Sequence, residues 1–225
     1  CILIRFNGCN LYCHFNNSPC DTLYASQKPE GNKKSINDLL QIMRENPQIT
    51  TFLITGGEPT IQPELLLDTI DLIRRRSNEN RIIIETNGTN FVDIPKIRYS
   101  HNNCNELIQI KYDGKCKDIF FSISPKLSNS IPNSSSIIMN KHNMIRTKYD
   151  QMLLTYQNYH CYFKFVYSSE EQIKEIKELI QRIKIPIDII YLMPEGNTPE
   201  QLSERDQEVV QICIDNGWKY SDRLH

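Results

Sequence analysis

Three of the eight cysteines in this chain of 225 residues lie close together, at Cys9, Cys13 and Cys20. They directly follow an apolar run at residues 2–6, which is typical of a strand that feeds a loop. Thiolates bind zinc and iron–sulfur clusters, and an iron–sulfur cluster is normally held by four cysteines. Three thiolates on a 4Fe–4S cubane would leave one iron without a protein ligand. Because an open coordination position is where a small molecule binds and reacts, the loop predicts a metal centre with chemistry at its fourth iron.

Four other unusual short sequences each follow the carboxyl end of an expected strand. They are Gly56-Gly57-Glu58-Pro59, Asn87-Gly88-Thr89, Ser124-Pro125-Lys126 and Met193-Pro194-Glu195-Gly196. The carboxyl ends of parallel strands meet at one edge of a barrel, where active sites are built. Any one of these motifs could be an ordinary turn, since Gly and Pro mark loops wherever strands end. Their convergence with a three-cysteine loop favours a single site at that edge.

Apolar runs and helical spacing predict strands and helices that alternate along the chain. We expect helices that begin near Ser35, Pro63, Lys141, Ser169 and Ser203. The strands are expected at 2–6, 50–55, 81–86, 118–123, 161–166 and 186–191, with a short one at 107–110 weighed against a loop. This alternation indicates parallel βα units, and six main strands are too few for a closed eight-fold barrel. The expected fold is α/β, a partial (β/α)6 TIM-like barrel in one domain over residues 1–225, with a mobile excursion at about 127–142.

Composition excludes several classes of function. The net charge is −1, so no bulk charge indicates nucleic acid or membrane as a partner. No stretch approaches the roughly 20 apolar residues of a membrane span, and the start does not read as a signal peptide. Three clustered cysteines in a chain of this size favour a metal site in the reducing cytoplasm over a disulfide framework. The others are expected to be small core residues or surface thiols: Cys1, Cys104, Cys116, Cys161 and Cys213.

The cysteine loop resembles a known family. Gly-Cys-Asn-Leu-x-Cys at residues 8–13, followed by Cys-Asp-Thr at 20–22, is similar to the cluster loop of radical S-adenosylmethionine (SAM) enzymes. Within that superfamily it looks most like the 7-carboxy-7-deazaguanine synthase family. The usual spacing is Cys-x3-Cys-x2-Cys, and this chain widens the second gap to residues 14–19. The synthase family tolerates insertions at this point.

The resemblance implies a set of cofactor contacts. Cys9, Cys13 and Cys20 would hold a 4Fe–4S cluster, and the glycine-rich motif would bind the aminoacyl group of SAM. The Ser and Lys of the Ser-Pro-Lys triplet would bind the SAM carboxylate, and the backbone at 192–195 would bind the adenine. The implied SAM residues are Pro19, Cys20, Asp21, Gly57, Glu58, Ser124, Pro125, Lys126, Leu192, Met193, Pro194 and Glu195.

It also implies contacts to a magnesium ion and to a substrate. Thr22 matches a magnesium-contacting hydroxyl, although Asp21-Thr22 alone could be a turn or cap. The implied substrate residues are Arg5, Thr55, Glu85, Asn87 and His225. Taken without the resemblance, Asn87-Gly88 could simply end a strand, and Arg5 could pair at the surface. The other histidines, at 14, 101, 142 and 160, have no partner pattern and are expected to be polar surface residues.

The implied activity is conversion of 6-carboxy-5,6,7,8-tetrahydropterin to 7-carboxy-7-deazaguanine with loss of ammonia, in queuosine-type deazapurine biosynthesis. An external one-electron donor and a homodimer are the implied partners. Members of the family usually carry a short segment that contributes to the substrate pocket, whereas this sequence begins at Cys1 inside an expected strand. Two other hypotheses remain open. One is a radical SAM activase of a glycyl-radical partner protein, and the other is a non-enzymatic zinc or redox-sensing module.

Overall fold

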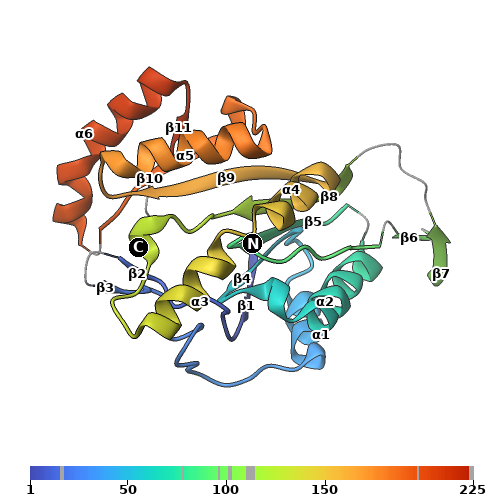
Figure 1. Cartoon of the computed structure of the whole chain (residues 1–225). Coiled ribbons are helices and arrows are strands. Elements are labelled where there is room, and N and C mark those ends of the chain that lie inside the picture. The colour runs from blue at the N-terminus through green and yellow to red at the C-terminus, as the bar shows by residue number, and fades with distance from the viewer. Residues whose placement is uncertain are drawn as a thin grey trace.

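Seven parallel strands form the central sheet of the part of the chain that the structure describes (Figure 1). The computed structural model describes residues 1–15, 18–77, 79–95, 97–100, 103–109, 115–196 and 198–222. In spatial order the strands are β1 (Ile2–Phe6), β4 (Thr51–Gly56), β5 (Arg81–Thr86), β8 (Cys116–Ile123), β9 (Tyr159–Tyr167), β10 (Ile190–Pro194) and the short β11 (Lys219–Tyr220). Every pairing along this order is parallel. The predicted α/β fold with six main strands is confirmed.

Helices connect the strands and cover the outer face of the sheet. They are α1 (Ile36–Glu45), α2 (Pro63–Arg76), α3 (Ser136–Arg146), α4 (Tyr149–Asn158), α5 (Glu170–Ile183) and α6 (Pro199–Asn216). Figure 1 shows α5 and α6 on one side of the strands and α1 and α2 on the other. Ser35 caps α1 in a reciprocal capping box with Asp38, as its position before an apolar-periodic run predicts.

The alternation of side chains along each strand separates the core from the site. Phe52, Ile82 and Phe163 are fully buried against the helices. Residues of the opposite parity point to the inner face, and there Glu85 of β5 lies beside Ser122 of β8 in register. Apolar side chains therefore hold the helices, while polar ones collect on the inner face.

Several predicted elements differ from the structure. Residues Ile187–Ile189 form a 3-10 turn, so the last long strand begins at Ile190 rather than at 186. The helix expected to begin near Lys141 is two helices, α3 and α4, because the chain turns between Arg146 and Tyr149. The helix expected from 203 begins at Pro199, where Thr198 caps it. A hairpin, β6 (Ile97–Ser100) with β7 (Asn103–Gln109), occupies the region weighed between strand and loop; residue 110 lies outside the described residues.

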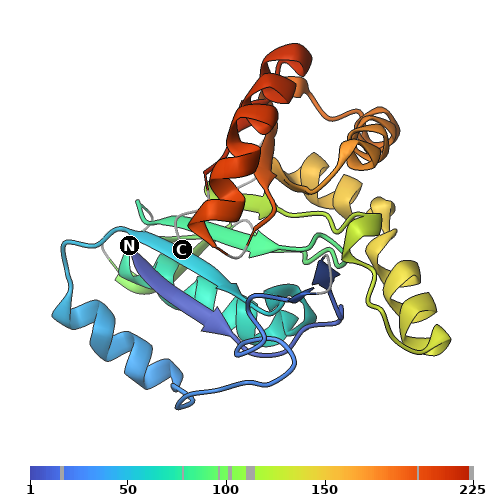
Figure 2. The same ribbon diagram turned by 90° about the vertical axis from the view of Figure 1, so that its left-hand side faces the viewer.

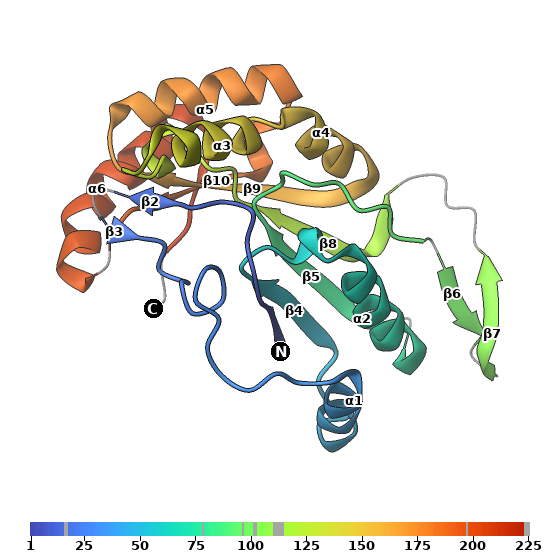
Figure 3. The ribbon, with the colours of Figure 1, turned by 60° about the horizontal axis from the view of Figure 1, so that its bottom comes forward.

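The widened cysteine loop has structure of its own. Two short antiparallel strands, β2 (His14–Phe15) and β3 (Ser18–Pro19), form within the gap between Cys13 and Cys20. Figure 2 shows this loop between the end of β1 and helix α3, and Figure 3 shows β2 next to α3. In the described residues, no helix is long and apolar enough to cross a membrane.

Candidate active site

A cavity lies at the carboxyl ends of the sheet strands, where the short motifs were expected to meet. All three clustered cysteines line it, together with residues from the loops or ends of β4, β5, β8 and β10. The predicted site residues in its wall are Cys9, Cys13, Pro19, Cys20, Asp21, Thr22, Thr55, Gly57, Glu85, Asn87, Ser124, Lys126, Met193 and Glu195. The structure thus brings together side chains that are up to 186 positions apart in the sequence.

Five other predicted residues that the structure describes do not line the cavity. Arg5 is exposed, and its guanidinium lies 5.1 Å from the ring centre of Tyr24. Pro125, Leu192 and Pro194 are buried behind the wall. Glu58 is also buried, and His225 lies outside the described residues.

The carboxylate of Glu58 joins the ends of two neighbouring strands. One oxygen accepts hydrogen bonds from the Thr60 amide, the Thr60 hydroxyl and the Thr86 hydroxyl at 3.0, 2.6 and 2.7 Å. The other accepts from the Asn87 amide at 2.6 Å. Burial raises the pKa of Glu58 and these donors oppose that rise. The side chain therefore positions the loop after β5 from behind the cavity wall instead of reaching into the cavity.

The two glycines before Glu58 are required by close backbone packing. A Cβ on Gly56 would lie 2.0 Å from the Phe6 carbonyl oxygen, and one on Gly57 would lie 2.1 Å from that of Gly8. The Gly57 amide donates to the Phe6 oxygen at 3.0 Å, so the end of β4 extends along the start of the cysteine loop. Without side chains here, the backbone at Gly57 forms part of the cavity wall.

Asn87 connects the end of β5 to the cysteine loop. Its Nδ2 donates to Asn10 Oδ1 at 3.0 Å and lies 4.0 Å from Cys9 Sγ. Its Oδ1 accepts from the Thr89 amide and hydroxyl at 3.0 and 2.7 Å. Thr89 in turn accepts from Asn10 Nδ2 at 2.8 Å. This closed network fixes Asn87 beside Cys9.

The cysteines lie in a poorly solvated environment. Burial raises the pKa of the Cys9 thiol to about 11 and that of Cys13 to about 12. Cys20 contacts the Thr22 hydroxyl at 3.3 Å. Thiols with raised pKa values are inert as nucleophiles, whereas a bound metal deprotonates them.

Charged side chains also line the cavity. Lys126 Nζ donates to Ser124 Oγ at 3.0 Å. Glu85 accepts from the Thr55 hydroxyl at 2.7 Å and lies 3.9 Å from Lys164 Nζ. Here both signs of charge face one cavity.

Sequence reasoning missed several residues of the wall and misplaced one histidine. Ser26, Ser122, Lys164 and Val166 line the cavity, and the alternation along β8 and β9 could have identified all but Ser26.

His142 was expected at the surface, yet it is fully buried. Its Nδ1 accepts from the Tyr12 amide at 3.2 Å, and its Nε2 lies 3.2 Å from Ser130 Oγ. No sequence pattern marked this contact between residues 130 positions apart.

Comparison with known proteins decides the family. The radical SAM superfamily profile matches residues 3–100. A 7-carboxy-7-deazaguanine synthase of Rhodopirellula baltica is 34% identical over 99% of this chain and 76% of its own length. That of Halobacterium salinarum is 26% identical over 100% of this chain and 80% of its own length. The chain belongs to the 7-carboxy-7-deazaguanine synthase family.

The fold agrees with this membership. The crystal structure of Streptococcus suis SuiB bound to S-adenosylmethionine superposes with a TM-score of 0.51 at 14% identity, over 99% of this chain. The chain spans about half the length of SuiB, 49%. At this identity the likeness shows the radical SAM fold alone.

Membership in a radical SAM family implies a 4Fe–4S cluster and SAM, and the cavity of this synthase-family chain fits them. In the described residues, no three His, Cys, Asp or Glu side chains converge tightly enough for a single metal ion. A cubane bonds each cysteine to a different iron, so its ligands need not meet at one point. Ser26 Oγ, buried in the cavity wall, has no hydrogen-bond partner in the described part of the chain, as expected of a group that meets a ligand.

Proposed function

We propose that this chain converts 6-carboxy-5,6,7,8-tetrahydropterin to 7-carboxy-7-deazaguanine with loss of ammonia. The observation that supports it is the meeting of three cysteines, the Glu85–Thr55 pair and the Lys126–Ser124 pair around one cavity, in a chain of this family. The balance is redox-neutral, because ammonia accounts for every atom that the substrate loses. SAM can therefore be regenerated in each turnover.

The cofactors would be held by the loops after β1, β4, β8 and β10. Cys9, Cys13 and Cys20 would hold the cluster, and together the cluster and SAM supply radical chemistry when bound. The Lys126 ammonium, steadied by Ser124, suits the SAM carboxylate. Gly57 offers backbone groups to the aminoacyl end, with Glu58 acting through the loop that it holds. The adenine would lie at 192–195, where Met193 and Glu195 line the cavity.

The substrate would lie over the inner face of β4, β5 and β9. Glu85 and the Thr55 hydroxyl offer an acceptor and a donor to the edge of the pterin ring. The Lys164 ammonium adds a cation beside them that suits the substrate carboxylate. Asn87 contributes to the same wall. Arg5 and His225 stay predictions from the resemblance.

A magnesium ion, a homodimer, a cytoplasmic location and an external one-electron donor belong to the same proposal. Thr22 lines the cavity, and its hydroxyl donates to Asp21 Oδ1 at 3.2 Å. A hydroxyl oxygen and a carboxylate are the kinds of oxygen ligand that Mg²⁺ prefers. The rest of the magnesium shell would come from substrate oxygens and water.

The test is anaerobic incubation of the cluster-reconstituted protein with SAM, Mg²⁺, dithionite and 6-carboxytetrahydropterin, followed by mass spectrometry. We expect 7-carboxy-7-deazaguanine with SAM largely unconsumed, and no product from the Cys13→Ala variant. Formation of 5′-deoxyadenosine and methionine with the pterin untouched would contradict the substrate while keeping the radical SAM chemistry, as for an activase. A colourless protein that binds zinc but no SAM would favour the metal-module hypothesis.

A further inference from the structure

The loop after β10 is held on both sides through the main chain of Glu195. The Glu195 amide donates to the Tyr167 carbonyl, at the end of β9, at 2.8 Å. The Glu195 carbonyl accepts from the Arg205 guanidinium of α6 at 3.3 Å. Both backbone groups of Glu195 therefore have partners on neighbouring elements, and these bonds fix its place in the cavity wall.

The same guanidinium binds the side chain of Glu195. Arg205 Nη1 lies 2.8 Å from Glu195 Oε2. The Glu195 side chain is 10% exposed and that of Arg205 is 31% exposed. A carboxylate with so little access to water needs a charged or hydrogen-bonding partner. Arg205 thus holds Glu195 at two points, one on the main chain and one on the side chain.

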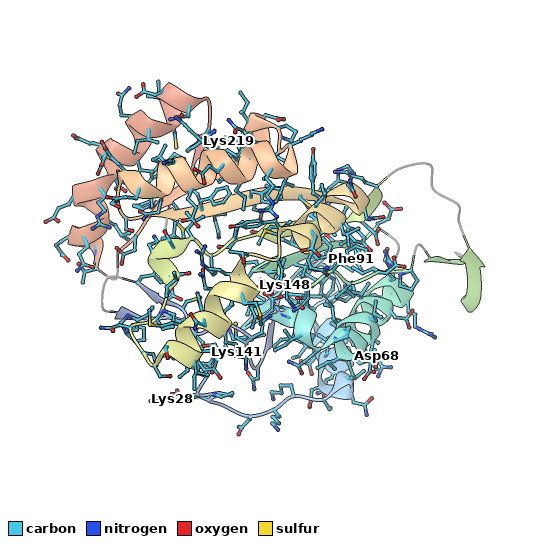
Figure 4. The ribbon with its side chains drawn as sticks, viewed as in Figure 1. Lys28, Asp68, Phe91, Lys141, Lys148 and Lys219 are labelled. Carbon is cyan, nitrogen blue, oxygen red and sulfur yellow. The ribbon has the colours of Figure 1, made fainter. Side chains whose placement is uncertain are left out.

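A second bond connects α6 to the end of β9. Glu208 accepts a hydrogen bond from the hydroxyl of Tyr167, which is buried. Positions 205 and 208 lie on one face of the helix, so this face is directed at the ends of β9 and β10. Figure 4 shows α6 with its side chains and labels Lys219 of β11, the strand that follows the helix.

The beginning of α6 also packs closely against the residue after Glu195. A Cβ on Gly196 would lie 3.0 Å from Leu202 Cδ2 and 3.1 Å from Gln201 Cβ. A side chain at this position would crowd the first turn of the helix. The loop and the helix therefore move together, and the position of α6 sets that of the cavity wall at Glu195.

The guanidinium acts from outside the cavity. Arg205 is not among the described residues that line it, whereas Glu195 is. No sequence motif marked Arg205, because its contact with Glu195 depends on how α6 packs against the end of β10. A group in this position affects a ligand only through the residues that it holds.

We propose that Arg205 is a positioning residue for the adenine half of SAM and acts through Glu195. The inference rests on the proposed function, in which the adenine lies at 192–195. The edge of an adenine ring is recognised by donors and acceptors at fixed positions, and these depend on the residues that support them. A misplacement of about 1 Å can cost about 100-fold. Without the guanidinium, the carbonyl and the carboxylate of Glu195 lose their common partner, and the wall at this point loosens.

The first experiment compares ligands with and without adenine. Cluster-reconstituted wild type and Arg205→Met would be titrated with S-adenosylhomocysteine by calorimetry, and with methionine by the EPR spectrum of the reduced cluster. We expect the dissociation constant of S-adenosylhomocysteine to rise at least tenfold in Arg205→Met, and that of methionine to stay within twofold. A general loss of structure at the site would weaken both ligands alike.

Two control variants each remove one positive charge elsewhere. Arg75→Met breaks an ion pair with Asp71 of the same length, 2.8 Å, on α2. Lys219→Met removes an ammonium that lies 5.2 Å from the ring centre of Tyr191 on β10. Both should bind S-adenosylhomocysteine within twofold of the wild type. Arg205→Lys keeps a charged donor and should recover the affinity to within threefold of the wild type.

A double-mutant cycle tests whether Arg205 acts through Glu195. In a Glu195→Ala background, Arg205→Met should weaken binding of S-adenosylhomocysteine by no more than a further threefold. Equal affinity of the wild type and Arg205→Met would overturn the inference, as would an equal loss for methionine. A wild-type protein that binds neither SAM nor S-adenosylhomocysteine would contradict the proposed function, and the inference with it.

Discussion

The two halves of the cavity wall satisfy their polar groups in different ways. In the half next to the cysteine loop, the polar side chains bond one another: Glu58 takes four donors and Asn87 bonds Asn10 and Thr89. In the other half, formed by the ends of β5, β8 and β9, Lys126 donates to one hydroxyl, and Lys164 lies 3.9 Å from Glu85, beyond hydrogen-bond length. Apart from Ser26 Oγ, the polar side chains named in the first half are paired before any ligand arrives, whereas the second half keeps ammonium donors for one.

This difference matches two kinds of task. A metal cluster needs ligands held in a fixed geometry, and a saturated network of buried hydrogen bonds supplies that rigidity. A substrate that enters and leaves needs donors whose bonds form only in the complex, since those add affinity. Substitutions in the first half should therefore cost stability of the free protein, and substitutions in the second should cost ligand binding.

The largest effect is expected for Glu58→Ala. It leaves the donors of Thr60, Thr86 and Asn87 buried without an acceptor, at a cost of about 3–5 kcal/mol. Anaerobic urea unfolding of the metal-free protein measures the loss. The control, Glu195→Ala, removes the carboxylate that pairs with the partly exposed Arg205 and should cost about 1 kcal/mol. Equal losses from the two substitutions would contradict the comparison.

Burial of His142 predicts that the free energy of unfolding depends on pH. Burial, with Arg146 and Lys126 nearby, lowers its pKa from 6.5 to about 4, so the folded state keeps the ring neutral. The stability gained from the neutral ring is present above pH 6.5 and is lost as the pH falls from there to about 4. The full loss approaches about 3 kcal/mol. The wild type should therefore lose stability relative to His142→Asn over that range, as measured by urea unfolding at a series of pH values.

The asparagine keeps an acceptor for the Tyr12 amide and does not titrate. His142→Ala removes both ring contacts and should destabilise at pH 7.5 by about 2–3 kcal/mol. Parallel pH curves for the wild type and His142→Asn would show that the His142 ring has the same pKa in the folded and unfolded states, contrary to this prediction.

The position of the site at one edge of the sheet was predictable from sequence, because it depends on local signals. The cysteine spacing, the Gly-Gly pair and the strand ends placed the motifs at one edge of the sheet. The family resemblance implied Thr55 and Glu85 as substrate residues, and both line the cavity. The placement of the motifs follows from chain order and period, which the sequence shows directly.

Contacts between distant segments were not predictable in this way. The position of His142 depends on how α3 packs against the cysteine loop, and the sequence around it shows only a polar residue in a helix. From the sequence, Glu58 was expected to face a ligand. Two of its four donors come from Thr86 and Asn87, about 28 positions away, and no local pattern shows these bonds. Whether a polar side chain points into the cavity or behind it depends on such tertiary bonds.

Asn87→Ala should have an intermediate effect with a second readout. It removes the bonds to Asn10 and Thr89, at about 1–3 kcal/mol in urea unfolding. It also removes the amide that lies 4.0 Å from Cys9 Sγ, and hydrogen bonds to cluster sulfurs tune the reduction potential. The potential of the reconstituted cluster, titrated by EPR, should become more negative. An unchanged potential would confine Asn87 to a structural role.

Lys164→Met tests the ligand half, where stability should hardly change. The ammonium is partly exposed and its ion pair is long, so unfolding should shift by no more than about 0.5 kcal/mol. We expect the KM for the pterin to rise at least tenfold, because a charge-assisted bond to the substrate is lost. SAM affinity should stay within twofold. Lys174→Met on α5 is the control, and an equal KM change in that variant would refute the assignment.

The smallest effect on the free protein is expected for Ser26→Ala. Ser26 Oγ is buried without a partner among the described residues, so its removal should be neutral or stabilising by up to about 1 kcal/mol. Ser130→Ala is the matched control, because that buried hydroxyl donates to Leu127 and contacts His142, and its loss should cost about 1–2 kcal/mol. If Ser26 keeps its hydroxyl for a ligand, the cluster-loaded Ser26→Ala protein should bind SAM about three- to tenfold more weakly by calorimetry. A stability loss equal to that of Ser130→Ala, with unchanged SAM affinity, would instead place Ser26 among the groups that the folded chain satisfies by itself.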